Sequence, residues 1–209
     1  MSGDVTLLVM AKAPVPGRVK TRLTPPFSPV EAAALAEAAL RDTLDVVLAA
    51  PAQRRVVALD GLPGDWLPPG LEVIPQGCGG LDERIAGALE SLAGPVLLVG
   101  MDTPQLTVTH LSVSFDDHDA WFGPAEDGGF WALGLAEPDP ALVRGVPMST
   151  EHTGAAQLDR LHAAGLRVGQ LDRLRDVDTA ACAKAVARAA PHGRFAALHA
   201  TFLAGAVPA

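Results

Sequence analysis

Four basic side chains follow the apolar segment VTLLVM, within the sequence AKAPVPGRVKTRL. They are Lys12, Arg18, Lys20 and Arg22, and no carboxylate occurs in residues 5–30. Arg and Lys bind phosphate oxygens through charge-assisted hydrogen bonds, and Gly17 allows the backbone to approach a ligand closely. The segment therefore predicts a phosphate-binding loop. A solvated basic loop is the alternative.

Asp102 comes directly after the apolar segment PVLLVG, in GMDTP. If that segment is a buried strand, Asp102 lies at the same sheet edge as the basic loop, where ligands of open α/β sheets bind. Mg²⁺ in proteins takes one or two carboxylates together with substrate phosphates. Asp102 is therefore a candidate metal ligand, and a turn formed with Thr103 and Pro104 is the alternative.

Two further carboxylates lie two residues apart in RDVDT. In an extended segment this spacing places Asp176 and Asp178 on one face, so they would complete a metal site with Asp102. As an alternative, Asp178 or Thr179 is the N-cap of the next helix. Capping and metal binding are compatible.

Asp127 precedes Gly128 and Gly129 in GPAEDGGFWALGL. The two glycines would let an acceptor lie against the backbone, and Asp127 would orient a hydroxyl group or contact the metal. A tight Asp-Gly hairpin turn explains the same residues without a function.

Several familiar sites are excluded by spacing. Gly17 is followed by Arg18 and no earlier glycine occurs in the loop, so this is not a Walker loop. GCGGLD has Asp82 where a dinucleotide-binding fingerprint needs its third glycine. The six histidines show no HExxH spacing, and there is no GxSxG motif of a serine hydrolase.

Short apolar segments alternate with helical patterns, which predicts an α/β fold with a single, mainly parallel sheet flanked by helices. The expected strands are VTLLVM, RRVVALD, LEVIP, PVLLVG, AWFGP, FWALGL and LRVGQL. The expected helices follow Ser28, span Leu81 to Leu92, start near Thr153, and include AACAKAVARAA and RFAALHATFLAG. Ser28, Pro29 and Glu31 form the pattern of a capping box, and Pro51 marks the end of that first helix.

Composition limits the class of protein. A chain of 209 residues with 49% hydrophobic residues can form one α/β core, so residues 1–209 are expected to be a single domain. A net charge of -8 argues against non-specific nucleic-acid binding. Two distant cysteines suit reduced thiols, and no apolar segment reaches the length of a membrane span. We expect a cytoplasmic protein. The sequence does not define an oligomeric state.

Four of these motifs occur in the order and approximate spacing of a known bacterial family. AKAPVPGRVKTRL, GMDTP, GPAEDGGFWALGL and STEHT…LRDVDT resemble a family of the nucleotide-diphospho-sugar transferase superfamily, labelled glycosyltransferases of the arsenosugar-biosynthesis type. More distantly, the chain resembles the 2-phospho-L-lactate guanylyltransferases, which have Lys-Ser-Arg-Leu in the place of KTRL. The resemblance covers roughly Val5 to Ala190.

The resemblance implies a Rossmann-like GT-A fold that binds a nucleotide over the first loop. It implies that Asp102 with Asp176 and Asp178 holds Mg²⁺ or Mn²⁺ on the diphosphate. The nucleotide-binding residues it implies are Ala11, Lys12, Pro14, Gly17, Arg18, Lys20 and Arg22, with Gln76, Gly77 and Arg84 near the base and ribose. The segment GCGGLDERI departs from the family, which more usually reads close to Gly-Asp-Leu-Gly-Glu-Arg there.

Three functions are compatible with these residues. In nucleotidyl transfer, a small phosphorylated or carboxylate acceptor attacks the α-phosphorus of a nucleoside triphosphate, while Arg18 and Lys20 neutralise the leaving pyrophosphate. In glycosyl transfer, a nucleotide sugar is the donor and Asp127 positions the acceptor hydroxyl. A catalytically silent nucleotide-binding protein is the third. The sequence favours a metal-dependent transferase, with nucleotidyl transfer ahead of glycosyl transfer.

Overall fold

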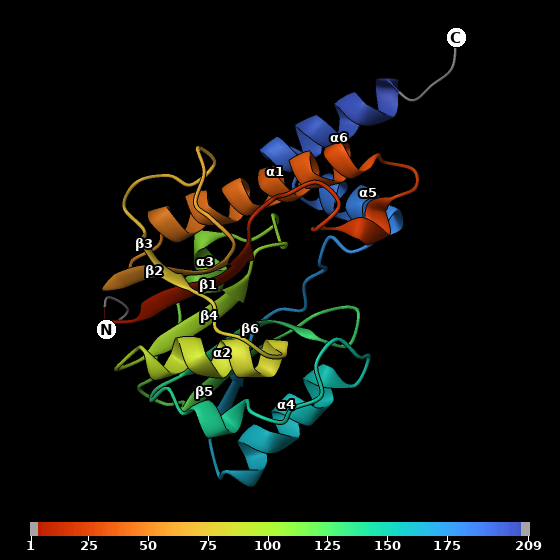
Figure 1. Ribbon diagram of the computed structural model, residues 1–209. Helices are drawn as coiled ribbons and strands as arrows, with labels where there is room; N and C mark the ends of the chain where they lie inside the picture. Colours follow the sequence, from red (N-terminus) through yellow and green to blue (C-terminus); the bar gives the residue numbers. More distant parts are fainter. Residues whose placement is uncertain (1–3, 206–209) are drawn as a thin grey trace.

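The computed structural model describes residues 4–205, in which seven strands form one sheet. The strand order is β3-β2-β1-β4-β6-β5-β7, and Figure 1 shows the sheet between two layers of helices. The strands are β1 (Thr6–Lys12), β2 (Arg54–Asp60), β3 (Glu72–Pro75), β4 (Val96–Gly100), β5 (Ala120–Pro124), β6 (Phe130–Leu135) and β7 (Val168–Gln170). The predicted α/β fold with a single mixed sheet is confirmed. That residues 1–209 form one domain stays a prediction, because residues 1–3 and 206–209 lie outside the described part.

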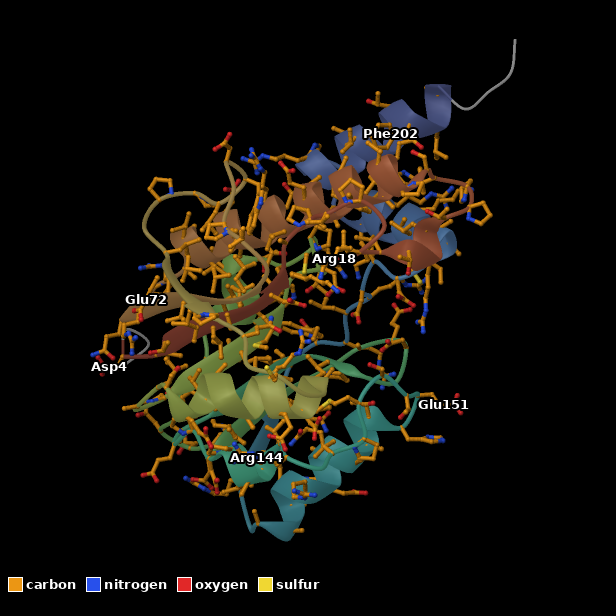
Figure 2. The ribbon with its side chains drawn as sticks, viewed as in Figure 1. Asp4, Arg18, Glu72, Arg144, Glu151 and Phe202 are labelled. Atoms are coloured by element: carbon orange, nitrogen blue, oxygen red, sulfur yellow. The ribbon has the colours of Figure 1, made fainter. Side chains whose placement is uncertain are left out.

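Strand direction decides where the functional loops lie. β6 is antiparallel to β4 and β5, whereas every other pairing in the sheet is parallel. The carboxyl ends of the other six strands therefore share one edge, and β6 begins there. Figure 2 shows Asp4 and Glu72 near the opposite edge from Arg18 and Glu151.

Helices cover both faces of the sheet. Figure 1 shows α1 and α3 on one face, with α5 and α6 beside α1, and it shows α2 and α4 on the other. The helices are α1 (Pro29–Ala49), α2 (Leu81–Glu90), α3 (Val108–Leu111), α4 (Thr153–Ala163), α5 (Ala180–Ala189) and α6 (Arg194–Gly205), with short 3₁₀ helices η1 (Thr21–Leu23) and η2 (Pro140–Leu142). The longer helices match the sequence prediction, whereas α3, η1 and η2 were not predicted. No helix within residues 4–205 has the length and apolar character needed to cross a bilayer.

The side chains of β1 point alternately into the two main core clusters, one on each face of the sheet. Leu7 and Val9 pack with Leu40 of α1, whereas Leu8 and Met10 pack on the other face in the cluster that contains Ile85 of α2. Successive side chains of a strand point to opposite faces, so β1 is buried on both sides.

The predicted capping box at the start of α1 is present. The Ser28 side chain accepts a hydrogen bond from the Glu31 N–H at 3.3 Å, and Glu31 Oε2 accepts one from the Ser28 N–H at 2.8 Å. These reciprocal bonds fix where the first loop ends and α1 begins.

A third core cluster joins α1, α5 and α6 to the two charged segments. Leu23 follows the basic loop, and Val177 lies between Asp176 and Asp178; both are 0% exposed and belong to the cluster that contains Phe195. Burial of Leu23 and Val177 anchors the charged segments to the same apolar core, so the charges around them have little freedom to separate.

Asp42 of α1 caps the start of α6. Asp42 is 8% exposed as a residue. Its carboxylate accepts hydrogen bonds from the N–H groups of Arg194 at 3.0 Å and Phe195 at 2.9 Å. The first N–H groups of a helix have no partner within the helix, and a negative charge is favourable there.

We predict that Asp42→Ala lowers the free energy of unfolding by about 1–3 kcal/mol, because it leaves these donors without an acceptor. Thermal unfolding followed by circular dichroism measures the loss. Asp45→Ala is the control, since Asp45 pairs with the same Arg194 but its side chain is 53% exposed, and it should cost less than about 1 kcal/mol. Equal losses in the two variants would contradict the capping role of Asp42.

Candidate functional site

Two cations of the first loop are paired with carboxylates from distant parts of the chain. Lys20 adopts a left-handed backbone conformation with φ 48°, and its side chain is 12% exposed and contacts Asp102 Oδ2 through Nζ. Arg22 Nη1 donates to Asp178 Oδ2 at 2.8 Å. The left-handed conformation is costly for a residue other than glycine, and such positions concentrate at functional sites. Because the Lys20–Asp102 and Arg22–Asp178 pairs join distant segments, the loops after β1, β4 and β7 meet, as the sequence predicted for the first two.

The other residues of the loop differ in their surroundings. Lys12 ends β1, with Nζ 3.8 Å from Asp60 Oδ2, whereas Arg18 is exposed at the tip of the loop. Gly17 has φ +74°, a conformation that favours glycine. Pro14 is half-buried between them. Lys20 and Arg22 are thus the loop cations paired with Asp102 and Asp178, whereas the Arg18 side chain is exposed to solvent.

A backbone hydrogen bond joins the two acidic segments. The Val177 N–H donates to the Asp102 carbonyl oxygen at 2.9 Å, and Val177 is fully buried. Val177 lies in the core, whereas its neighbours Asp176 and Asp178 are only half-buried. Both line the same cavity as Asp102 and Asp127. The structure thus brings together all four carboxylates singled out in the sequence.

Asp176 is the most perturbed of these carboxylates. Its Oδ1 atom is buried and has no hydrogen-bond partner among the described residues. Burial, followed by the nearby charges of Asp102 and Asp127, raises the pKa of Asp176 to about 7. The ionised form is therefore costly unless a cation approaches it.

This arrangement fits a divalent cation in its chemistry. Carboxylate oxygens are the donors that Mg²⁺ and Mn²⁺ prefer, and the buried Oδ1 of Asp176 lacks a partner. As arranged, residues 4–205 contain no group of three His, Cys, Asp or Glu side chains in position to hold a metal. Asp102 and Asp178 instead contact Lys20 and Arg22. The metal site therefore stays a prediction.

The carboxylates line a cavity of about 500 Å³ at the carboxyl edge of the sheet. Its opposite wall comes from the segment that precedes α4, which includes Met148, Thr150 and Glu151. The sequence analysis quoted this segment only as part of the STEHT motif and did not assign it to the site. Its position between a strand and a helix was the available signal, but the fold is needed to place it beside the Asp127 turn.

The turn at Asp127 has a structural role and also faces the cavity. Asp127 Oδ1 accepts a hydrogen bond from the Gly129 N–H at 2.8 Å. Gly128 has φ +90°, and a Cβ atom there would lie 2.1 Å from the Glu151 carbonyl oxygen. The Gly154 N–H donates to the Gly128 carbonyl oxygen at 2.8 Å. The glycines therefore allow the segment before α4 to pack on this turn, while Asp127 lines the cavity.

A second cavity, of about 330 Å³, lies at the ends of β1 and β2 and contains four of the predicted nucleotide-binding residues. They are Ala11, Lys12, Gln76 and Arg84. Met10 and Leu81 line both cavities, so the two adjoin. Two other predicted nucleotide-binding residues, Pro14 and Gly77, are not among the residues within 4–205 that line this second cavity.

Polar contacts organise this second cavity. The Gln76 amide donates to the carbonyl oxygens of Ala11 at 2.8 Å and Ala58 at 2.9 Å. Arg84 Nη1 donates to Asp60 Oδ2 at 2.8 Å, and this bond lowers the pKa of Asp60. The sequence analysis missed Asp60, although its place at the end of RRVVALD puts it at the functional edge.

A family model described as "Uncharacterized protein conserved in bacteria (DUF2064)" matches residues 34–150. The chain belongs to this family. The DUF2064 match includes Asp102 and Asp127, whereas the basic loop, Asp176 and Asp178 lie outside it. No curated protein sequence matches the chain.

Solved structures share the fold of this DUF2064 chain. One is a protein from Desulfovibrio desulfuricans G20 assigned by name to the nucleotide-diphospho-sugar transferases, with 25% identity, a TM-score of 0.83, and coverage of 95% of this chain and 94% of that one. Another is Rv0371c of Mycobacterium tuberculosis H37Rv in complex with manganese, with 19% identity, a TM-score of 0.54, and coverage of 89% and 98%.

A third is CMP:2-keto-3-deoxy-manno-octonic acid synthetase with CTP, with 16% identity, a TM-score of 0.53, and coverage of 90% and 99%. The likenesses to Rv0371c and to this synthetase show the fold alone. The predicted resemblance to nucleotide-diphospho-sugar transferases is thus confirmed as a structural similarity. The arsenosugar label and the likeness to 2-phospho-L-lactate guanylyltransferases stay predictions.

We predict that Asp176→Asn raises the stability of the metal-free protein at pH 8. Because the pKa of Asp176 is raised from 3.8 to about 7, ionisation of this group lowers stability as the pH rises between these values; the loss is complete at pH 8, and the amide removes it. A gain of about 1 kcal/mol would raise the melting temperature by about 2–4 °C in a protein of this size. Asp172→Asn is the control, because the Asp172 side chain is 86% exposed, and it should change little. A lower melting temperature for Asp176→Asn would contradict this view of the site.

Proposed function

We propose that this protein is a metal-dependent nucleotidyltransferase that transfers a nucleotidyl group from a nucleoside triphosphate to a small acceptor. The observation that carries the proposal is the direct contact of Lys20 and Arg22 with Asp102 and Asp178 at the carboxyl edge of the sheet. It brings groups suited to phosphate and groups suited to a metal to one place.

The class of enzyme rests on the solved structures. The expectation of a transferase is confirmed at this level, because proteins with this fold include the Desulfovibrio desulfuricans protein assigned as a nucleotide-diphospho-sugar transferase and a CMP-sugar synthetase that binds CTP. The reaction type, the metal and the substrates are part of our proposal.

The two adjoining cavities suit the two substrates. In our proposal the base and ribose occupy the cavity at Ala11, Gln76 and Arg84, and the phosphates extend over the first loop toward Lys20. Exposed Arg18 contacts the outermost phosphates, and Arg22 approaches from the rim of the larger cavity. The acceptor then enters the larger cavity beside Asp127.

Asp102, with Asp176, Asp178 or both, would hold Mg²⁺ or Mn²⁺. When bound, the cation neutralises negative charge on the phosphate oxygens as the bond to the leaving group breaks. The manganese complex of Rv0371c supports this choice of metal. Lys20 and Arg22 would leave these carboxylates and pair with phosphate oxygens, so each side chain exchanges one ionic partner for another.

The residues of the chain then divide the reaction between them. The acceptor oxygen attacks the α-phosphorus, a new P–O bond forms, and the bond from the α-phosphorus to the oxygen bridging to the β-phosphorus breaks. Asp127 orients the acceptor and takes its proton where the acceptor is a hydroxyl group. Lys20 and Arg18 stabilise the negative charge that the leaving pyrophosphate gains.

Glycosyl transfer from a nucleotide sugar is the second candidate. It is favoured by the 25% identical protein, which is assigned to the nucleotide-diphospho-sugar transferases. The same cations would then stabilise a leaving nucleoside diphosphate, and Asp127 would orient the acceptor hydroxyl. Nucleotidyl transfer is preferred because three cations, Arg18, Lys20 and Arg22, suit the larger charge of a triphosphate.

We predict that Lys20→Ala weakens binding of a nucleoside triphosphate by about 10-fold or more, since a hydrogen bond to a charged group contributes about 1.5–3 kcal/mol. Arg22→Ala should act in the same direction. Calorimetric titration with ATP, CTP, GTP and UTP in the presence of Mg²⁺ measures both effects. Arg54→Ala is the control, because Arg54 pairs with Glu72 at the other edge of the sheet. Unchanged affinity in both loop variants would mean that the loop is a solvated basic surface.

The reaction is tested by its products. With Mg²⁺ or Mn²⁺ and a panel of small acceptors, we expect pyrophosphate from a nucleoside triphosphate; nucleoside diphosphate released from a nucleotide sugar would instead establish glycosyl transfer. Asp102→Asn and Asp178→Asn should each abolish turnover, and the double variant should cost much less than the sum, because either change alone disables the site. Full activity in chelator, or strictly additive losses, would refute the proposed metal site.

A further inference from the structure

The larger cavity carries an excess of negative charge. Besides Asp102, Asp176 and Asp178, its wall includes Asp127 and Glu151 on the side of the segment before α4. Among the lining residues found within residues 4–205, Arg22 is the single Lys or Arg, and its guanidinium already binds Asp178. Lys20 is bound to Asp102. Asp127 and Glu151 also line the cavity, and neither forms an ion pair with a Lys or Arg within residues 4–205, although Glu151 Oε1 lies 3.5 Å from His152 Nε2.

A metal and a nucleotide would not reverse this balance. The proposed cation sites are Asp102, Asp176 and Asp178, and a nucleoside triphosphate carries more negative charge than a divalent cation neutralises. Asp127 and Glu151 lie on the wall that the acceptor contacts. An acceptor with a phosphate or carboxylate group would therefore be repelled by both, whereas a cationic group would be attracted.

Apolar side chains form another part of the cavity wall, beside the hydroxyl groups of Ser149, Thr150 and Thr153. Met10, Ile85 and Leu98 come from the buried core and are 8%, 3% and 3% exposed. Phe130 and Met148, both half-buried, complete this surface. A pocket that combines an apolar wall with a few polar groups binds the body of a ligand on the first and orients it with the second.

Asp127 and Glu151 form the acidic wall of the larger cavity, and hydrogen bonds within the segment that carries Glu151 hold this wall in place. Thr153 Oγ1 donates to the Pro147 carbonyl oxygen at 2.8 Å and accepts from the Thr150 N–H at 3.1 Å. Together with the packing of Gly128 against Glu151, these bonds fix the segment beside the Asp127 turn. Figure 2 shows Glu151 on the loop beside α4. The wall is thus formed before a ligand binds, which favours binding.

We propose that the larger cavity selects an acceptor alcohol with an apolar body and a neutral or positive charge, such as an amino alcohol, and excludes phosphorylated and carboxylate acceptors. This inference rests on the proposed function and narrows it, because the sequence alone predicted a phosphorylated or carboxylate acceptor. Asp127 and Glu151 act as specificity residues, and Asp127 also receives the hydroxyl proton.

Three probes of nearly the same shape test the charge preference: cyclohexylmethylamine, cyclohexylmethanol and cyclohexanecarboxylate. Their dissociation constants are measured by NMR titration of the full chain at pH 7.5 and constant ionic strength, with and without Mg²⁺ and a non-hydrolysable nucleoside triphosphate. We expect the amine to bind most tightly, the alcohol next, and the carboxylate at least about 10-fold more weakly than the amine, since the carboxylates that line the cavity attract the amine and repel the carboxylate.

Charge-neutral variants identify the residues responsible. Asp127→Asn with Glu151→Gln should bring the amine and the carboxylate to within about 3-fold of each other, a difference of about 0.7 kcal/mol. The Glu151 side chain is 81% exposed, and Asn keeps the oxygen that accepts from the Gly129 N–H, so this variant is expected to fold. Glu137→Gln is the control: Glu137 is exposed and follows β6, at the opposite edge of the sheet, and the ranking should not change.

Three outcomes would overturn the inference: equal or tighter binding of the carboxylate, an unchanged ranking in the double variant, or no binding of any probe at the cavity. None of them depends on turnover. Loss of the proposed function would appear separately, as a protein that binds no nucleoside triphosphate but retains the probe ranking.

Discussion

The site depends on carboxylates that the fold holds together against their mutual repulsion. Val177 is fully buried, and its N–H donates to the Asp102 carbonyl oxygen, so the segment that carries Asp176 cannot move away from the end of β4. The buried Oδ1 of Asp176 has no hydrogen-bond partner in the described chain, and its pKa is raised to about 7. Such an arrangement is costly unless cations offset it, which Lys20 and Arg22 do in part from the first loop.

This constraint links the metal to the nucleotide in our proposal. Lys20 and Arg22 each bind a carboxylate that is also a proposed metal ligand. A divalent cation at these carboxylates would release the two side chains for phosphate oxygens, and phosphates that attract the side chains would release the carboxylates for the cation. Binding of either partner would therefore strengthen binding of the other, and by linkage the two effects must be equal.

The sequence predicted the parts of the fold that local patterns define. Apolar segments of five to seven residues predicted the strands, and Ser28 with Glu31 predicted the start of α1. The position of Asp102 after PVLLVG predicted its place at the functional edge. The contacts that join distant segments were out of reach of these patterns. Neither the hydrogen bond of Val177 with Asp102 nor the packing of Glu151 on Gly128 has a local signal, because each depends on how β5, β6 and β7 pair. Glu151 was missed as a residue of the larger cavity for the same reason, whereas Asp127 was predicted.

The most direct test of the metal–phosphate arrangement is a crystal structure with Mn²⁺ and a non-hydrolysable nucleoside triphosphate, with data collected at a wavelength where manganese scatters anomalously. We predict an anomalous peak at coordination distance from Asp102 and from at least one of Asp176 and Asp178, with Lys20 turned from Asp102 to the phosphates. A nucleotide bound with no manganese at these carboxylates, or with Lys20 still paired with Asp102, would contradict the account.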